Sequence, residues 1–212
     1  METRTVHLAV YEALADWEPG HLVARLNSSH WQREPGTYAV ATVSETGKPV
    51  TTMGGVRIVP DLALEDLEPA ASAMLVLPGA DSWDEGQNGA FAQTARRFLQ
   101  DAVPVAAICG GTFGLAREGL LDERDHTSNA PEYLGATGYA GAAHYRDEPV
   151  VTDGDLITAG ATASLEFARE ALARLEVFEP EVLDAWYGLF STGDARFFAT
   201  LAAAEQEVEA SR

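Results

Sequence analysis

One segment of the sequence places a nucleophile in a setting that favours reactivity. The stretch from Val105 to Ile108 is apolar, Cys109 follows it, and Gly110 and Gly111 open a helix-forming stretch. A buried strand, a tight turn with one nucleophile and a helix make up a nucleophile elbow. Small neighbours suit the strained backbone of such a turn. The helix N-terminus predicts a stabilised thiolate and a lowered thiol pKa. The alternative is that Cys109 is a small buried core residue.

Two other segments can bring polar groups to the same place. The loop after the preceding apolar stretch contains Gly79 and Ala80. Their backbone N–H groups, with that of Gly110, could form an oxyanion hole for a tetrahedral intermediate. Glu18 follows the first strand and precedes Pro19. Its carboxyl group can reach the centre of the sheet, or it can be an acid favoured at a helix start. Ligands of open α/β sheets bind at the carboxyl ends of the strands.

The elements that must position these residues alternate along the chain. Strands are expected at 5–11, 37–43, 72–77 and 103–108, hairpins at 49–60 and around Asp153-Gly154, and short strands and turns within 126–160. Helices are expected after Asp16 as N-cap, at about 87–101 and 162–175, and once or twice within 180–206. Strands that are apolar on both faces indicate a parallel sheet covered by helices on each side. The pattern predicts one three-layer α/β domain.

Composition excludes several classes of function. The chain has 212 residues and a formal net charge of −19, so binding to nucleic acid or to an anionic membrane is not expected. It has a single Cys and no apolar stretch long enough to span a membrane. With no secretory signal near its start, a cytoplasmic location is expected. Nucleotide-binding motifs are absent, and the acidic Asp122–Asp125 stretch is typical of a solvated turn. We therefore expect neither a cofactor nor a metal.

Several motifs occur in an informative order: the Cys-Gly-Gly elbow, the Pro-Gly loop, Ala15-Asp16-Trp17-Glu18, Asp153-Gly154 and Leu165-Glu166-Phe167-Ala168. Together they resemble the ThiJ/PfpI superfamily, relatives of the class I glutamine amidotransferases, over about residues 5–175. The stretch His126-Thr127-Ser128-Asn129 and the aromatic tail at 185–198 are similar to a YoaZ-like branch of cysteine proteases and amidases. The resemblance implies a flavodoxin-like α/β/α sandwich with a mostly parallel central sheet. It also implies a homodimer of one domain, 1–212, with a helical extension at about 178–212.

The resemblance also implies roles for individual residues. Cys109 matches the reactive cysteine, and Glu18 matches an acid that hydrogen-bonds the sulfur and is usually protonated. Gly79 and Ala80 match a loop that lends a backbone donor, with Ala80 where the family has a second glycine. The N–H of Gly110 completes the oxyanion hole.

The family histidine is missing from its usual place. Protease-like and deglycase-like members carry a His at most about twenty residues after the Cys, and alignment puts Asn129 there. His126 lies three positions earlier, which in a strand points to the opposite face. His144 is a second candidate. A base must reach the sulfur by a hydrogen bond, so His126 and His144 are the candidate bases to be located in the structure.

Two functions follow from this reading. The first is a cysteine-dependent hydrolase, amidase-like or peptidase-like, or else a glyoxalase-like or deglycase-like enzyme, acting on a small amide or carbonyl substrate. The second is a stress-response protein with little turnover that senses oxidation at Cys109. The missing His favours the second, and the intact elbow with its oxyanion loop favours the first. A third possibility is an elbow that survives only as scaffold.

Overall fold

A seven-stranded sheet forms the centre of the computed structural model, which describes residues 3–210. The strand order is β5-β2-β1-β6-β7-β9-β8. The strands are β1 (Arg4–Ala9), β2 (Tyr38–Ser44), β5 (Leu62–Ala63), β6 (Met74–Leu77), β7 (Val105–Ile108), β8 (Val150–Asp153) and β9 (Leu156–Ala159). All neighbours pair in parallel except β8 and β9, which form the expected hairpin. The carboxyl ends of β1, β6, β7 and β9 therefore share one edge of the sheet.

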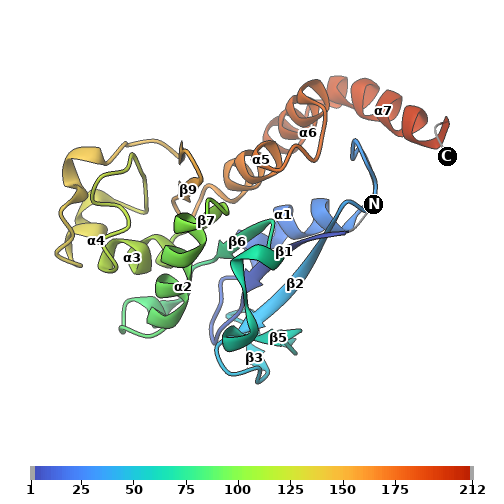
Figure 1. Ribbon diagram of the computed structural model, residues 1–212. Coiled ribbons are helices and arrows are strands. Elements are labelled where there is room, and N and C mark those ends of the chain that lie inside the picture. Colours follow the sequence, from blue (N-terminus) through green and yellow to red (C-terminus); the bar gives the residue numbers. More distant parts are fainter. Residues whose placement is uncertain (1–2, 211–212) are drawn as a thin grey trace.

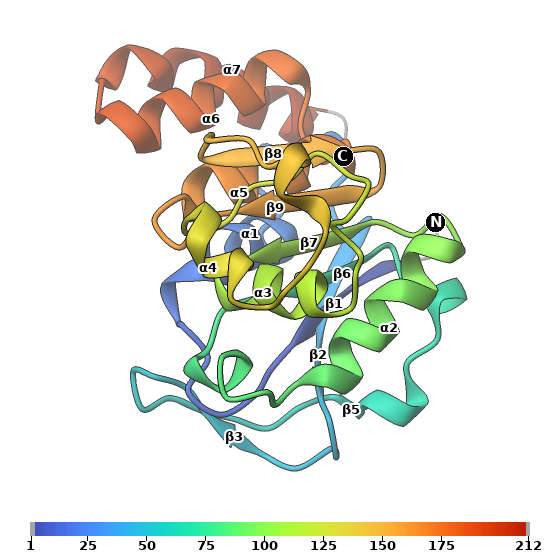
Figure 2. The same cartoon turned by 90° about the vertical axis from the view of Figure 1, so that its left-hand side faces the viewer.

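Helices cover both faces of this sheet (Figure 1). They are α1 (Trp17–Asn27), α2 (Gly89–Gln100), α3 (Gly110–Arg117), α4 (Pro131–Gly135), α5 (Ser164–Arg174), α6 (Pro180–Thr192) and α7 (Phe198–Ala210). Helix α1 packs with α5, and α2 packs with α3. Helix α6 follows on α5, and α7 on α6 at the periphery (Figures 1 and 2). This is the expected flavodoxin-like sandwich. Among residues 3–210, no helix is long and apolar enough to cross a membrane.

The core explains why the short central strands hold their places. Every residue of β6, β7 and β9 is buried. Phe91 and Phe98 of α2 are fully buried on one side, and Phe167 and Leu172 of α5 on the other. Burying one such side chain stabilises a fold by about 1.5–3 kcal/mol. The central strands are thus fixed from both faces, and so are the loops at their ends.

The segment 126–149 differs from the sequence prediction. Short strands were expected there, but the structure has α4, a 3₁₀ turn at Gly141–His144 and one isolated bridge between His126 and Tyr145. Pro131 occupies the first turn of α4, where its fixed φ angle favours a helix and its missing N–H costs nothing. The segment is therefore a connection that crosses the sheet edge near the elbow.

Asp16 was predicted to cap the first helix, but its side chain bonds to a hairpin instead. It occupies the N-cap position of α1, but its side chain makes no capping hydrogen bond. Its carboxylate instead accepts from Thr52 Oγ1 at 2.5 Å and from the Gly54 N–H at 2.6 Å. Those residues belong to the predicted hairpin, whose strands are β3 (Val50–Thr51) and β4 (Arg57–Ile58). The hydrogen bond from Thr52 lowers the pKa of Asp16, so the ionised carboxylate ties the hairpin to α1.

Replacing Asp16 with Ala is expected to loosen this hairpin. Two hydrogen bonds to a charged group are lost, each contributing about 1.5–3 kcal/mol. The measurement is the rate of trypsin cleavage after Arg57, which is exposed on β4. We expect cleavage to accelerate severalfold in Asp16→Ala and to stay unchanged in Asp66→Ala, an exposed carboxylate outside the hairpin. Equal cleavage of Asp16→Ala and the unaltered chain would contradict this assignment.

Candidate active site

Cys109 lies in a strained turn between β7 and α3. Its backbone has φ 55° and ψ −122°, although it is not a glycine. Such angles cost free energy and persist only where surrounding contacts hold them. Here the Cys109 N–H donates to the carbonyl of Ala159 at 3.0 Å, while Thr112 Oγ1 donates to the Cys109 carbonyl at 2.6 Å. The partly exposed side chain stands at the carboxyl edge of the sheet, as expected for a nucleophile elbow.

Glu18 and Gly79 meet the cysteine at this edge. A Cβ atom placed on Gly79 would lie 2.8 Å from Cys109 Sγ and 2.9 Å from Glu18 Oε1, so no larger residue fits at position 79. The Gly79 N–H donates to Glu18 Oε2 at 2.5 Å. Glu18 is fully buried, and its Oε1 has no hydrogen-bond partner among the described residues. One carboxyl oxygen is therefore fixed by backbone, and the other is free beside the sulfur.

The backbone donors differ in part from the predicted oxyanion hole. The Gly79 N–H is engaged by Glu18 and cannot serve there. The Ala80 N–H has no acceptor among the described residues. A Cβ placed on Gly110 would lie 3.2 Å from Ala80 N, so these two backbone segments approach closely. The Gly110 N–H faces the sulfur of Cys109. The available donors are thus those of Ala80 and Gly110.

Electrostatics at the site oppose the predicted lowered thiol pKa. Burial raises the pKa of Glu18 to about 7, although the hydrogen bond from Gly79 pulls in the other direction. Burial, and then the charge of Glu18, raise the pKa of Cys109 to about 12. These effects outweigh the field of the α3 N-terminus. Near neutral pH the thiol is therefore protonated, while Glu18 is close to half ionised.

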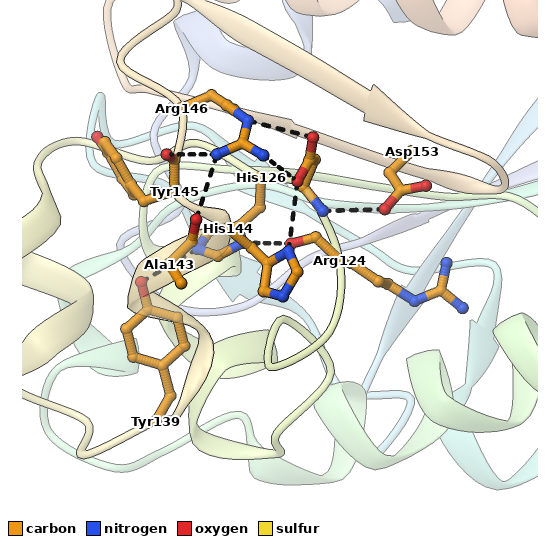
Figure 3. A network of polar contacts seen from close by, with 9 residues as sticks. Arg124, His126, Tyr139, Ala143, His144, Tyr145, Arg146 and Asp153 are labelled. Carbon is orange, nitrogen blue, oxygen red and sulfur yellow. Dashed lines mark hydrogen bonds and ion pairs between the residues drawn. The ribbon is translucent and has the colours of Figure 1, made fainter.

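The two candidate histidines belong to a polar network of their own with Arg124, Tyr139 and Arg146 (Figure 3). His126 is fully buried, with Nδ1 2.7 Å from the Arg124 carbonyl and Nε2 3.1 Å from the Tyr139 hydroxyl. His144 Nδ1 lies 3.4 Å from Asp125 Oδ1. Neither imidazole makes a hydrogen bond to the cysteine. The expectation that His126 or His144 is the base therefore does not fit this geometry.

Asn129 occupies the place beside the sulfur instead. Its Nδ2 donates to Cys109 Sγ at 3.3 Å, and its Oδ1 accepts from the Ala161 N–H at 2.9 Å. Asn129 also lines an open cleft of about 470 Å³ together with Gly160 and Ala161. Asn129 joins this cleft to the elbow, whereas Cys109, Glu18 and Ala80 do not line the cleft. No cluster of three or more His, Cys, Asp or Glu side chains suited to a metal occurs within residues 3–210.

Two aromatic residues that sequence reasoning missed support the donor loop. The Tyr11 hydroxyl donates to the Pro78 carbonyl, and Trp83 Nε1 lies 3.1 Å from the same oxygen. The two rings pack edge to face at 5.6 Å. A Tyr two residues after β1 was the available signal, since its hydroxyl needs a partner when buried. These contacts hold the loop that carries Gly79 and Ala80.

Comparison with known proteins identifies the family of the chain. The model of the DJ-1/PfpI family matches residues 4–174. The chain belongs to the DJ-1/PfpI family. It is 38% identical over 204 residues to "Uncharacterized protease YoaZ" of Bacillus subtilis, covering 95% of this chain and 97% of the relative. The crystal structure of a thiJ/pfpI family protein from Bacillus anthracis superposes with a TM-score of 0.90 at 37% identity. That match covers 97% of this chain and 98% of the other.

A more distant relative is named as a glyoxalase rather than as a protease. "Glutathione-independent glyoxalase DJR-1.2" of Caenorhabditis elegans is 24% identical over 142 residues, covering 66% of this chain and 75% of the relative. DJ-1/PfpI relatives of the chain are thus named as a protease and as a glyoxalase. These names indicate enzymatic activity in the family without fixing one reaction.

Proposed function

We propose that this DJ-1/PfpI protein is a cysteine-nucleophile hydrolase that acts on small amide or carbonyl compounds. The main support is that Cys109 Sγ and the buried, partly ionised Glu18 face the same small space at Gly79. The Gly110 N–H faces the sulfur, and the Ala80 N–H, which has no acceptor among the described residues, lies close to Gly110. A nucleophile, a proton acceptor and two backbone donors thus lie together at one edge of the sheet. The cleft beside Asn129 suits small compounds.

The first half-reaction uses Glu18 as the base. Ionised Glu18 takes the thiol proton as sulfur attacks the carbonyl carbon, so a C–S bond forms and the carbonyl electrons move to oxygen. The N–H groups of Ala80 and Gly110 stabilise that oxyanion. Glu18 then protonates the leaving amine, the C–N bond breaks, and a thioester remains on Cys109.

The second half-reaction restores the enzyme. Water attacks the thioester while Glu18 removes its proton, and the acid product leaves as the C–S bond breaks. The departing sulfur recovers the proton from Glu18. Because the pKa of Glu18 is about 7, kcat/KM is expected to rise with pH through that value.

A substrate panel tests the proposal. Small amides, glutamine, activated esters, α-oxoaldehydes and short peptides are offered to the unaltered chain, Cys109→Ala and Cys109→Ser. We expect turnover of at least one compound by the unaltered chain and a loss of more than about a thousandfold in both variants, because no other residue can form the thioester. Turnover that survives in Cys109→Ala would reject a cysteine mechanism.

A second candidate function is favoured by the donors around the sulfur. We propose oxidation sensing as the alternative, because Asn129 Nδ2, the Ala80 N–H and protonated Glu18 could all stabilise oxygen atoms added to Cys109. The sulfur would attack one peroxide oxygen, the O–O bond would break, and sulfenic acid and water would form. A further peroxide would give sulfinic acid. With one Cys in the chain, reversal of the first step needs an external thiol.

Peroxide treatment separates the two functions. Intact mass would follow the gain of one or two oxygen atoms on the unaltered chain and on Glu18→Ala. Selective oxidation at low peroxide that stops at one or two added oxygen atoms in the unaltered chain but not in Glu18→Ala, with no turnover in the panel, would favour sensing. Oxidation only at high peroxide, equal in both proteins, would reject it.

A further inference from the structure

The orientation of the Asn129 amide is set by its neighbours. A backbone N–H can only donate, so the Ala161 N–H requires an oxygen at the near end of the amide. The NH₂ group then faces Cys109 Sγ, at 3.3 Å. The other side of the same peptide segment is also fixed, because the Ala161 carbonyl accepts from Trp17 Nε1 at 3.3 Å. The sulfur therefore faces a donor at this position.

The backbone that carries Asn129 is anchored on both sides. The Thr127 N–H donates to Thr158 Oγ1 of β9 at 3.0 Å. Ser128 Oγ lies 2.6 Å from Thr112 Oγ1 of α3. On the remote side, the buried His126 ring is held within the network of Figure 3. The amide is thus presented to the sulfur by a rigid support.

We propose that Asn129 is a catalytic residue: its amide donates to the Cys109 thiolate and leaves Glu18 as the only group that exchanges a proton with the sulfur. This inference rests on the proposed function of Cys109 as nucleophile. A carboxamide stabilises an anion by donation but neither takes nor gives a proton near neutral pH. A histidine at the same place would compete with Glu18 for the thiol proton.

The general chemistry of thiols gives the size of the change in Cys109 reactivity that donation by Asn129 would cause. At a pH far below the thiol pKa only a small fraction of the sulfur is thiolate. A tenfold rise in that fraction therefore raises the rate of nucleophilic attack tenfold if nothing else changes. The accompanying fall in basicity lowers the intrinsic nucleophilicity by about threefold. The net gain is about threefold for each tenfold rise in thiolate fraction. Donation by Asn129 thus increases reactivity, because burial and Glu18 hold the pKa of the thiol so high.

The test measures the thiolate directly rather than its access to reagents. The ultraviolet absorbance of the thiolate is titrated against pH in a Glu18→Gln background, where removal of the Glu18 charge lowers the pKa of the Cys109 thiol. Each variant is referenced to the same protein with Cys109→Ser. The series is Glu18→Gln alone and with Asn129→Ala, Asn129→Asp or Ser128→Ala, and circular dichroism checks folding.

We expect Asn129→Ala to lower the thiolate fraction about tenfold at a given pH, as for loss of a hydrogen bond to a charged group. Asn129→Asp should lower it further, because Asp keeps the acceptor for Ala161 but brings negative charge to the sulfur. Ser128→Ala removes the contact with Thr112 but keeps the hydrogen bond from Ala161 that orients the Asn129 amide, so it should match the background.

Two results would overturn the inference: an unchanged titration in Asn129→Ala, or an equal shift in Ser128→Ala, which would assign the effect to packing. The titration needs no turnover, so its failure is distinguishable from failure of the substrate panel. A silent panel with the expected titration rejects hydrolysis and leaves the Asn129 contact standing.

Discussion

Glu18→Gln is expected to accelerate alkylation of Cys109 by iodoacetamide about tenfold at about pH 8, while it lowers turnover by about a hundredfold or more. The two effects have opposite signs because Glu18 acts on the sulfur in two ways. Its charge raises the pKa of the Cys109 thiol, and Gln removes that charge. Its carboxylate also carries the proton during turnover, and an amide cannot do so. Gln keeps the acceptor for the Gly79 N–H, so the site should stay assembled.

The measurement is intact mass against time over a range of pH. In the unaltered chain, alkylation should keep rising with pH beyond the ordinary range of thiols, because the pKa of Cys109 is about 12. Glu132→Gln, an exposed carboxyl on α4, serves as the control and should behave like the unaltered chain. Slower alkylation in Glu18→Gln would show that the carboxyl promotes the thiolate rather than opposing it. Equal losses of alkylation and turnover would indicate a collapsed site.

Gly111→Ala is expected to destabilise the whole domain. A Cβ on Gly111 would lie 2.2 Å from the carbonyl oxygen of Leu77, a backbone atom of β6 that cannot move aside alone. Overpacking of this kind costs about 3 kcal/mol. For a chain of this length that corresponds to a fall in Tm of about 10 °C, measured by thermal unfolding. The helix that follows the elbow would also shift from β6, so alkylation of Cys109 should change as well.

Gly20→Ala provides the matched control for this prediction. Gly20 lies within α1 and is exposed, and a Cβ there would meet no atom within 4 Å. Ala in an open helix position stabilises by about 0.5–1 kcal/mol relative to Gly. Gly20→Ala should therefore raise Tm slightly. A Tm for Gly111→Ala equal to that of the unaltered chain would contradict the tight packing of α3 on β6.

Much of the fold was predictable because the central strands are apolar on both faces. The stretches that became β6 and β7 could only be buried between two helix layers, and Asp153-Gly154 marked the β8–β9 hairpin. The segment 126–149 was not predictable in the same way. It has few apolar residues in a regular pattern, and its conformation depends on Pro131 and on long-range hydrogen bonds such as that between Thr127 and Thr158.

The candidate site was also predictable only in part. Cys109, Glu18 and the Gly79-Ala80 loop follow strands whose order fixes where they meet. The raised pKa of the thiol was missed, because burial and the distance to Glu18 are three-dimensional quantities. The orientation of Asn129 was also inaccessible, since it depends on Ala161, which is distant in the chain. Position within a strand could suggest that His126 faces elsewhere, but its partner Tyr139 is visible only in the structure.

The most direct test of the account is to trap the thioester on Cys109. The chain is mixed with a small activated ester, quenched in acid within one turnover, and digested for mass analysis of the peptide that contains Cys109. We expect an acyl group on that peptide, which accumulates in the unaltered chain and is absent from Cys109→Ala. Product formation without any acyl group on Cys109, or with the group on another residue, would contradict the proposal that this sulfur is the nucleophile.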